Sequence, residues 1–365
     1  MLKRKLRPMD LSRRELLAAT GAAAGAAAFG NFGQEKPVGW AVLGLGGYAT
    51  RNIMPNFKHC KHSRLVSLIT GSPEKGKMYG AQYGIPENKI YDYKNLEKIA
   101  NDPDIDVVYV ITPPGTHHKF VMRALKAGKH VSCEKPMTGD LKQAIELVEE
   151  AKKRNTRLGV GYRCHFEPHN LEAQRLCKEG KLGTIRYIRS DHGFTLGDWS
   201  QWHHKRAIGG YGAISEIGIY AIQAMCMFAG ADPIEVVGTR DKSSNKLFKE
   251  VEDSNHFTLV FPNGITGQGA TSYSWNANNV RIYGNAGRID AEPATGYENH
   301  QFTLNGQPMI PKDANQWALQ MDHLSQCIRD PKMTLKTGGD MGLRDVRIMD
   351  AILRSADAGG KPIRL

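Results

Sequence analysis

The sequence predicts an α/β chain with two domains, the first of them a doubly wound parallel sheet. Three observations lead to this fold class. The chain has 365 residues, which exceeds the usual size of a single hydrophobic core. Short apolar runs alternate with amphipathic helical patterns between residues 39 and 159, and a glycine-rich turn directly follows the first run. Strands separated by helices in this way pair in parallel, because each helix carries the chain back across the sheet.

The elements of the first domain follow one another in a regular order. A strand at 38–43 leads into the glycine turn and a helical pattern at 48–57. The remaining strands are expected at 64–69, 106–111 and 130–132, and the remaining helices at 74–83, 117–126 and 141–154. Ligands of such sheets bind beyond the carboxyl ends of the strands. The glycine turn, residues 112–117 and residues 133–136 should therefore lie at one edge.

The glycine turn reads Gly44-Leu45-Gly46-Gly47-Tyr48-Ala49. Gly44 permits the tight turn, Gly46 lets the backbone approach a pyrophosphate, and Ala49 is small enough for the helix to pack on the strand. The N-terminus of that helix then faces the phosphates. This pattern predicts a dinucleotide-binding domain. Its expected cofactor contacts at this edge are Gly44, Gly46, Gly47, Tyr48, Ala49, Thr112, Pro113, His117, Glu134 and Lys135.

The end of the second strand distinguishes NADP from NAD. An NAD site places an acidic side chain there to accept a hydrogen bond from the ribose 2′-hydroxyl, and that acid repels a 2′-phosphate. Here the strand ends in Thr70-Gly71-Ser72, with Lys75 close behind. Thr70 and Ser72 offer hydroxyls to the cofactor and Lys75 offers a cation. Although Glu74 lies one step into the helix, this set favours NADP, with NAD as the alternative.

The first 33 residues predict an export signal that lies outside the fold. Arg13 and Arg14 precede a short apolar stretch at 16–29, as in twin-arginine leaders. The stretch is too short for a mature transmembrane helix. The alternative is an alanine-rich amphipathic first helix. Because the twin-arginine machinery exports folded proteins, we expect a periplasmic protein that acquires its cofactor before export.

Charge and cysteine content argue against several classes of protein. The net charge is +12, and residues 1–33 hold six Lys/Arg and two Asp/Glu, which leaves +8 for the rest. We find no basic helix, no zinc-finger spacing and no basic run interleaved with aromatics, so nucleic acid is not an expected partner. The cysteines show no paired metal spacing, and we expect free thiols and no metal site. The six are Cys60, Cys133, Cys164, Cys177, Cys226 and Cys327.

A group of reactive side chains accompanies the nucleotide motifs. Lys135 stands in the run Cys133-Glu134-Lys135-Pro136-Met137 at the expected binding edge. Glu216 and Tyr220 are four residues apart, which on a helix places a carboxylate and a phenol on one face. Alone, such a pair is an ordinary polar helix face. Together with a lysine at a dinucleotide site, it indicates proton transfer with a substrate.

Several further motifs accompany these residues along the chain. They are the Thr-Pro segment ending at His117, residues 127–131 leading into Glu134-Lys135-Pro136, Gly161-Tyr162-Arg163, residues 217–220 and residues 342–347. Together with the glycine turn they resemble the glucose-fructose oxidoreductase and inositol dehydrogenase family, and most of all its periplasmic glucose-fructose oxidoreductase branch. The resemblance runs from about Val38 to the C-terminus. It implies a Rossmann domain at 34–158 and an α+β domain at 159–365, whose large, mostly antiparallel open sheet would use strand-like runs at 185–194 and 234–304.

The resemblance also implies catalytic roles. Lys135 would lie at the reacting carbon, Tyr220 would transfer a proton at the sugar hydroxyl, and Glu216 stands where aspartate is usual. A phenol with an ordinary pKa of about 10 serves as a base only beside a cation, and Lys135 can be that cation. Lys135 can also hydrogen-bond the developing oxyanion. Glu216 would orient Lys135 or accept a hydrogen bond from a sugar hydroxyl.

The same resemblance extends to the substrate pocket. Arg163 is expected to line it, and Trp202, His203 and His204 would form a wall on which a sugar stacks. The alternatives are a buried structural role for His117 and a solvated loop at 202–204. The Lys135–Pro136 bond is expected to be cis, as is frequent in the family.

The compartment constrains the reaction. The periplasm has no NADP pool, so the reduced cofactor must be reoxidised in place. We therefore expect a tightly bound NADP that is reduced by an aldose and reoxidised by a second sugar, a ketose or another aldose, in a ping-pong reaction. The alternatives are a sugar dehydrogenase that releases its cofactor, a redox epimerase or glycosidase, and a non-catalytic NADP-dependent sugar sensor.

Self-association is expected through the second sheet. Its predicted strands carry apolar residues at alternating positions, as in Phe257, Leu259 and Phe261 or in Val280 and Ile282. If helices cover one face only, an apolar open face would be buried by association, most commonly about a two-fold axis. This pattern predicts a homodimer, or a homotetramer made of two such dimers.

Overall fold

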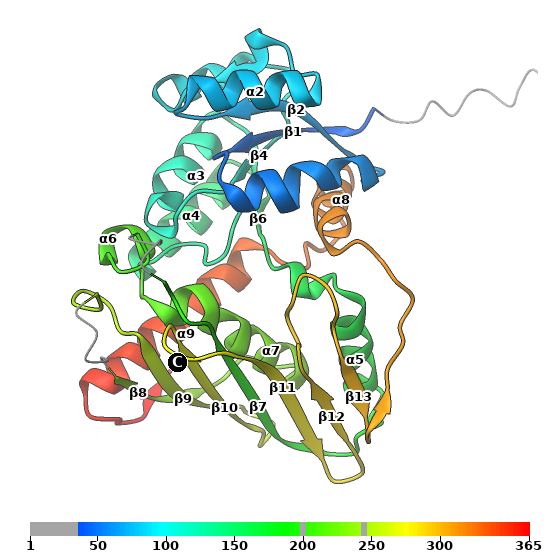
Figure 1. Ribbon diagram of the computed structural model, residues 1–365, viewed down its shortest axis with the longest axis vertical. Helices are drawn as coiled ribbons and strands as arrows, with labels where there is room; N and C mark the ends of the chain where they lie inside the picture. The colour runs from blue at the N-terminus through cyan, green and yellow to red at the C-terminus, as the bar shows by residue number, and fades with distance from the viewer. Residues whose placement is uncertain (1–35, 198–201, 242–246) are drawn as a thin grey trace, which may run out of the picture. The chain divides into compact units, whose positions relative to one another are not determined.

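The computed structural model describes residues 36–197, 202–241 and 247–365, so the predicted export signal lies outside the described residues. Its first sheet has six parallel strands in the order β3-β2-β1-β4-β5-β6. They are β1 (Val38–Leu43), β2 (Ser63–Ile69), β3 (Ile90–Tyr91), β4 (Val107–Val110), β5 (His130–Cys133) and β6 (Leu158–Val160). The strand order reverses between β1 and β4, and a ligand crevice is expected beyond their carboxyl ends. The predicted doubly wound fold is confirmed (Figure 1).

Helices connect these strands where the sequence predicts them, with one difference in type. The α-helices are α2 (Pro73–Tyr83), α3 (His117–Lys126) and α4 (Leu141–Lys153), and short 3₁₀ turns lie at Glu87–Lys89, Tyr93–Asn101, Pro114–Thr116 and Arg163–His165. The helix expected at 48–57 is not a regular α-helix. It is a π-helical turn at Ala49–Ile53 followed by a 3₁₀-helix at Met54–His59. Pro55, which lies near the junction, has no amide hydrogen to continue an α-helical ladder.

The second sheet has nine strands in the order β14-β13-β12-β11-β7-β10-β9-β8-β15. Neighbouring strands are antiparallel except for the parallel pair β7 and β10, which confirms the predicted, mostly antiparallel sheet. The strands are β7 (Ile185–Gly193), β8 (Glu235–Asp241), β9 (Ser254–Val260), β10 (Thr266–Ser272), β11 (Ala277–Gly284), β12 (Arg288–Ala291), β13 (Phe302–Leu304), β14 (Gln307–Pro308) and β15 (Ile363–Arg364).

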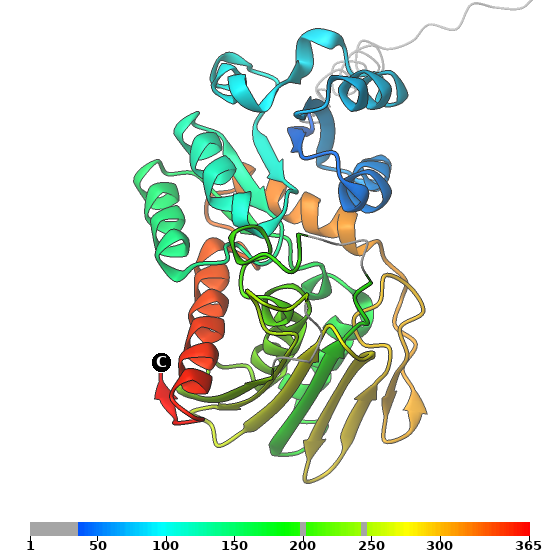
Figure 2. The same ribbon diagram turned by 60° about the vertical axis from the view of Figure 1, so that its left-hand side comes forward.

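Helices cover one face of this sheet (Figure 2). They include α5 (Pro168–Lys178), α7 (Ile219–Ala229) and α9 (Gly339–Asp357), and α7 is preceded by the short helix α6 (Arg206–Gly209) and a π-helical turn at Ile214–Gly218. Among the described residues, Arg206–Ala229 is the one helical stretch long and apolar enough to cross a membrane. Of its most apolar window, 83% is buried inside the protein, as in a core helix.

The open face of the second sheet differs from the prediction. The alternating apolar residues, such as Phe257, Leu259 and Ile282, are buried in the core that α7 and α9 share with the sheet. The open face instead carries polar side chains, among which Arg189 and Arg281 are exposed and paired across β7 and β11. The expectation of an apolar open face is therefore wrong, because a strand sends alternate residues to opposite faces and the apolar set lies under the helices.

Helix α8 (Gln316–Arg329) comes late in the chain but packs on the first sheet. The Trp40 indole donates a hydrogen bond to Ser325 Oγ at 2.9 Å. The Asp322 carboxylate accepts hydrogen bonds from the backbone amides of Lys61 and His62 at 2.6 and 2.9 Å. A segment that the sequence places with the second domain thus completes the packing around β1 and β2.

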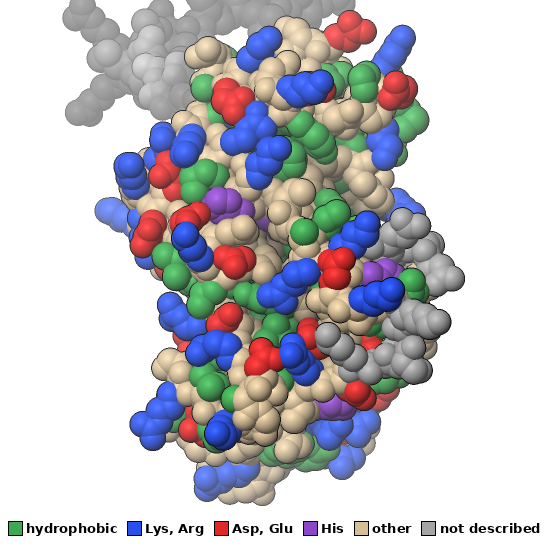
Figure 3. Space-filling view, turned by 90° about the vertical axis from the view of Figure 1, so that its left-hand side faces the viewer, with side chains coloured by type: hydrophobic (Ala, Val, Ile, Leu, Met, Phe, Trp, Pro, Cys, Tyr) green, Lys and Arg blue, Asp and Glu red, His purple; other side chains and the backbone are tan. Residues whose placement is uncertain are grey.

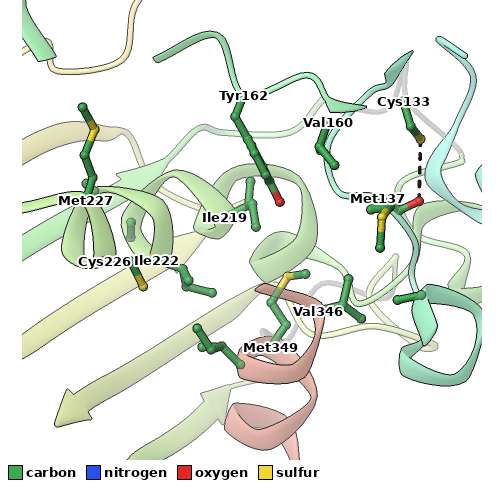
Figure 4. Packing of buried hydrophobic residues seen from close by; sticks show 14 of the residues in the cluster. Cys133, Met137, Val160, Tyr162, Ile219, Ile222, Cys226, Met227, Val346 and Met349 are labelled. Carbon is green, nitrogen blue, oxygen red and sulfur yellow. Dashed lines mark hydrogen bonds between the residues drawn. The ribbon is translucent and has the colours of Figure 1, made fainter. Parts of the chain in front are cut away.

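One buried core joins the two sheets and fixes the site between them. It includes Cys133 and Val160 at the ends of β5 and β6, Ile219 on α7 and Val346 on α9 (Figure 4). All six cysteines are described and free, as expected. On the face drawn in Figure 3, Lys and Arg alternate with Asp and Glu, so that face has no continuous basic patch.

Candidate active site

The glycine turn has the backbone that the sequence predicts. Gly44 has φ +96°, and a Cβ there would lie 2.3 Å from the carbonyl oxygen of Ile111, so only glycine fits. A Cβ at Gly46 would meet nothing within 4 Å. This open space in front of Gly46 is where a bound pyrophosphate could approach the backbone.

A cleft of about 320 Å³ opens in front of this turn, between the two sheets. It brings together residues from the first domain with Glu216 and Tyr220 from the second. Its lining is Gly46, Gly47, Tyr48, Ile111, Thr112, Pro113, Pro114, Glu134, Lys135, Pro136, Trp202, Glu216, Tyr220 and Tyr297. The other predicted site residues do not line it directly. These are Gly44, Ala49, Thr70, Ser72, Lys75, His117, Arg163 and His203.

Lys135 is held at the centre of the cleft. It follows β5 and forms a cis peptide bond with Pro136, as expected. Its Nζ donates a hydrogen bond of 2.6 Å to the backbone carbonyl of Glu216. The same Nζ lies 4.7 Å from the centroid of the Tyr220 ring. The ammonium group therefore contacts the face of the ring, where a cation–π attraction holds it.

The carboxylate of Glu216 lines the cleft and is held by two neighbouring side chains. It accepts hydrogen bonds from Tyr273 Oη at 2.8 Å and from His203 Nε2 at 2.9 Å. Burial, followed by the neighbouring Glu216 charge, raises the pKa of Tyr273 well above its ordinary value, so this phenol stays a donor. The prediction that Glu216 orients Lys135 holds for its backbone oxygen. For its side chain, which is bonded to Tyr273 and His203, an orienting role stays a prediction.

The hydroxyl of Tyr220 has Arg163 beside it. Arg163 Nη2 is 3.5 Å from Tyr220 Oη, and Arg163 is only 3% exposed. Its guanidinium also donates to the carbonyl oxygens of Thr295 and Gly296 and to Gln316 Oε1, at 2.5, 2.8 and 2.9 Å. Among the described residues it has no carboxylate partner. The sequence assigns the cation at the phenol to Lys135, whereas the structure places Arg163 at the hydroxyl and Lys135 over the ring.

His117 joins two segments of the pocket edge from behind. Its side chain is fully buried, and its two ring nitrogens lie 2.9 Å from the carbonyl oxygen of Pro136 and 2.7 Å from that of Thr112. Burial lowers the pKa of this imidazole. Its contacts are those of a residue that positions the Thr112 and Lys135 segments.

Glu134 is buried at the base of the cleft. Its carboxylate accepts a hydrogen bond of 2.6 Å from Tyr109 Oη, which in turn accepts one of 2.8 Å from Gln320 Nε2. Burial raises the pKa of Glu134, although Tyr109 and Lys135 oppose the change. Because Gln320 lies on α8, the late helix contributes directly to the base of the site.

The end of β2 carries the groups expected to select the nucleotide. Ser72 Oγ caps α2 by accepting a hydrogen bond from the Lys75 amide at 3.3 Å and donates to Glu74 Oε2 at 2.9 Å. Lys75 Nζ reaches the carbonyl oxygen of Leu45 in the glycine turn at 3.2 Å. Hydrogen bonds from its own amide and from Ser72 lower the pKa of the exposed Glu74. A lysine cation therefore stands beside the glycine turn, and Glu74 is turned toward Ser72.

Aromatic rings form the outer wall of the cleft. Trp202 stacks on His203 with ring centroids 3.5 Å apart, which places the predicted sugar-stacking residue in the lining. Tyr297 lies 4.7 Å from the Arg163 guanidinium and 6.0 Å from the Tyr48 ring. The sequence gives no signal for Tyr297 or for Tyr273, because each reaches the site from a segment without a motif.

Comparisons with known proteins match both domains of this chain. The model of an oxidoreductase family with an NAD-binding Rossmann fold matches residues 38–162, and the model of the GFO/IDH/MocA C-terminal domain matches residues 170–290. The crystal structure of aldose-aldose oxidoreductase from Caulobacter crescentus, complexed with glycerol, is 42% identical, with a TM-score of 0.87 over 90% of this chain and all of that one.

Two proteins of lower sequence identity also resemble this chain, one in sequence and one in fold. The D-xylose 1-dehydrogenase [NADP(+)] of Haloarcula marismortui is 27% identical over 267 residues, covering 71% of this chain and 73% of that protein. An inositol dehydrogenase homologue from Azotobacter vinelandii, solved with NADH and myo-inositol, shares the fold at 22% identity and a TM-score of 0.77, covering 91% of this chain and 98% of that one. With both domains matched in order, the chain belongs to the GFO/IDH/MocA family of oxidoreductases.

Proposed function

We propose that this protein is an NADP-dependent sugar oxidoreductase that oxidises an aldose and passes the hydride to a second sugar. The observation that carries the proposal is the single cleft that Lys135 and Tyr220 share with the glycine turn. The likeness to aldose-aldose oxidoreductase at 42% identity supports sugars as the substrate class.

The residues present fit a bound NADP. The open space at Gly46 admits a pyrophosphate, and Lys75 offers a cation for the 2′-phosphate beside the turn. Thr112 and Pro113 would contact the nucleotide further along the same edge. When bound, NADP supplies the hydride acceptor and donor of the reaction.

The side chains of the cleft account for the proton. Tyr220 Oη would accept the proton of the sugar hydroxyl as it is oxidised, and the positive charge of Arg163 beside that oxygen favours the transfer. Lys135 would hydrogen-bond the same sugar oxygen as charge develops on it. In the reverse direction Tyr220 returns the proton to the second sugar.

The remaining polar groups would orient the sugar. The Glu216 carboxylate is fixed by Tyr273 and His203 and has lone pairs left to accept a sugar hydroxyl. Trp202, stacked on His203, offers an aromatic face to the sugar ring. These contacts would bind the aldose with the hydroxyl to be oxidised facing Tyr220.

Retention of the cofactor follows from the proposed compartment. The twin-arginine pattern at 1–33 supports export of the folded, NADP-loaded protein to the periplasm. Without free NADP there, a second sugar must reoxidise the bound cofactor, so the two sugars would alternate in one site. The second candidate is a dehydrogenase that releases its cofactor, which the likeness to the archaeal xylose dehydrogenase favours.

We also propose that the protein associates with itself as a homodimer or a pair of dimers. The open face of the nine-stranded sheet is the surface we assign to this contact. Its mixed polar character, with Arg189 and Arg281 exposed, fits an interface rich in hydrogen bonds and ion pairs.

The test uses the protein as purified and exhaustively dialysed. Mass spectrometry of the released nucleotide is expected to show NADP near one equivalent per chain. Addition of an aldose should either raise the reduced-nicotinamide absorbance once, until a second sugar abolishes it and forms the matching alditol, or, where the same aldose also accepts the hydride, form its own alditol without added cofactor. Turnover only with added, freely exchanging NADP would establish the dehydrogenase instead. If no aldose reduces the bound nucleotide and no alditol forms, the protein would be a sugar sensor and the proposed enzyme activity would be refuted.

A further inference from the structure

Outside the active-site cleft, three side chains of metal-ligand type gather at the start of α5. Glu167 Oε1 lies 2.8 Å from His169 Nδ1 and 3.6 Å from His300 Nδ1. Each of the three residues offers one ligand atom within 4.8 Å of the others. The two imidazole rings stack with centroids 5.6 Å apart and planes 25° apart. Two imidazoles and one carboxylate form a common protein ligand set for Zn²⁺.

The cluster is largely buried, and one of its ring nitrogens has no partner among the described residues. The side chain of Glu167 is 2% exposed and that of His300 is 7% exposed. His300 Nε2 is buried and has no hydrogen-bond partner among the described residues. A buried polar atom without a partner costs about 1–3 kcal/mol, and either ring nitrogen of histidine can bind a metal. His300 therefore has one ring nitrogen, Nδ1, facing Glu167 and the other, Nε2, buried without a partner.

The distances suit a small divalent ion. Ligand atoms at about 2.1 Å from a tetrahedral Zn²⁺ are about 3.4 Å apart. The 3.6 Å between Glu167 Oε1 and His300 Nδ1 is close to this value, whereas the 2.8 Å between Oε1 and His169 Nδ1 is a hydrogen bond that a bound ion would replace. The other carboxylate oxygen of Glu167 is held by the amide and the side chain of Asn170 at 2.8 and 2.6 Å. Such a hydrogen bond to a ligating carboxylate is the usual way in which its orientation is fixed.

A route from solvent reaches the cluster. It lines a cleft of about 570 Å³, to which His59, Glu298 and Asp313 also contribute. These additional imidazole and carboxylate groups favour entry of a cation and can supply a further ligand. The cleft shares Tyr297 with the active-site cleft.

The position of the cluster suggests what the ion would do. His300 ends a segment, residues 293–300, that supplies the Thr295 and Gly296 carbonyl oxygens to Arg163 and places Tyr297 in the active-site cleft. Asn170 of α5 donates a hydrogen bond of 3.2 Å to the Ala294 carbonyl oxygen of this segment. An ion between α5 and His300 would hold the C-terminal end of residues 293–300 to the same helix.

Although the sequence leads us to expect no metal site, we propose that Glu167, His169 and His300 bind a divalent transition-metal ion of the Zn²⁺ type, which fastens residues 293–300 to α5. The ion stabilises the wall of the active site and takes no part in hydride transfer. Because the ligands come from the described fold alone, the site stands independently of the sugar specificity proposed above.

The test is metal binding by full-length protein freed of metal with a chelator. Titration with Zn²⁺ by calorimetry is expected to show one equivalent bound at micromolar concentration or below, with a rise of several degrees in the unfolding temperature. Co²⁺ in place of Zn²⁺ should give the visible absorption of a low-coordinate site. The variants His169→Gln and His300→Gln should each weaken binding more than about 100-fold. The matched control is His256→Gln, a change of an exposed histidine on β9, which should bind as wild type.

Each outcome decides the proposal. No saturable binding at micromolar Zn²⁺, or binding kept by both histidine variants, would show that the cluster is only a hydrogen-bonded cap of α5. Glu167 is left unchanged because it also caps that helix. If the variants unfold, X-ray absorption of Zn²⁺-loaded wild type replaces them. It should show two imidazoles and a carboxylate, and any other ligand set overturns the assignment.

Discussion

Replacement of Tyr220 by phenylalanine tests the proposed proton transfer most directly. The change removes one oxygen, whose described contact is Arg163 Nη2 at 3.5 Å. The contacts of the ring remain, since Lys135 Nζ lies 4.7 Å and Arg163 Cζ 5.4 Å from its centroid. At 3.5 Å the lost hydrogen bond is long, so the loss of folding free energy should be about 1 kcal/mol. The variant should therefore fold and load NADP as wild type does.

The catalytic loss should be much larger than the loss of stability. A positioned group that accepts a proton contributes about 10²–10⁴-fold, or at least about 2.7 kcal/mol of transition-state stabilisation. We expect the rate at which an aldose reduces the bound cofactor to fall at least about a hundredfold in a stopped-flow absorbance experiment. The matched control is Tyr187→Phe, which removes a hydroxyl bonded to Gln268 on the second sheet. A Tyr220→Phe rate within a few-fold of wild type, with normal NADP loading, would remove Tyr220 from the mechanism.

The remaining predictions concern cofactor choice, pocket geometry, acid stability and assembly. In a binding titration of cofactor-free protein, Lys75→Ala should weaken the affinity for NADP at least about tenfold more than the affinity for NAD. Equal losses of affinity for the two cofactors would contradict the assigned 2′-phosphate contact. Glu216→Asp withdraws the carboxylate by about 1.5 Å, which takes it beyond hydrogen-bond reach of Tyr273 or His203. The KM for the aldose should therefore rise about tenfold. An unchanged KM would exclude Glu216 from sugar binding. Burial lowers the pKa of His165 to about 4, so its contribution to stability is full above about pH 6.5 and falls by about 3 kcal/mol as the pH drops toward 4. Urea unfolding of His165→Gln should show a weaker decline over that range, and an identical decline would refute this origin. Light scattering at micromolar concentration should give at least a dimer, and a monomer would rule out the proposed assembly.

The sequence determined the local elements and the nucleotide turn because both depend on short-range features. Apolar periodicity and glycine placement predicted four of the six parallel strands, β1, β2, β4 and β5, and the turn at Gly44, where φ is positive and a Cβ would clash with Ile111. The short strands β3 and β6 were missed, because two or three residues are too few to show a periodicity. The placement of Lys135 after β5 followed from the same alternation, since the carboxyl ends of parallel strands share one edge. The sequence did not show which side chains of the second sheet lie under the helices and which lie on its open face. Its two faces can be told apart only once the covering helices are placed.

Tertiary structure alone decided which groups meet. Arg163 is 153 residues from Gln316 and 57 from Tyr220, yet it bonds both, and no spacing along the chain encodes such contacts. The same holds for Glu167 and His300, which approach only because the segment after β12 folds back onto α5. Side-chain partners at this separation are set by how helices and sheets pack, and packing depends on the whole buried core. The sequence therefore named most of the chemical groups of the site, while the fold determined that Arg163 faces the phenol oxygen and that the Glu216 carboxylate faces Tyr273.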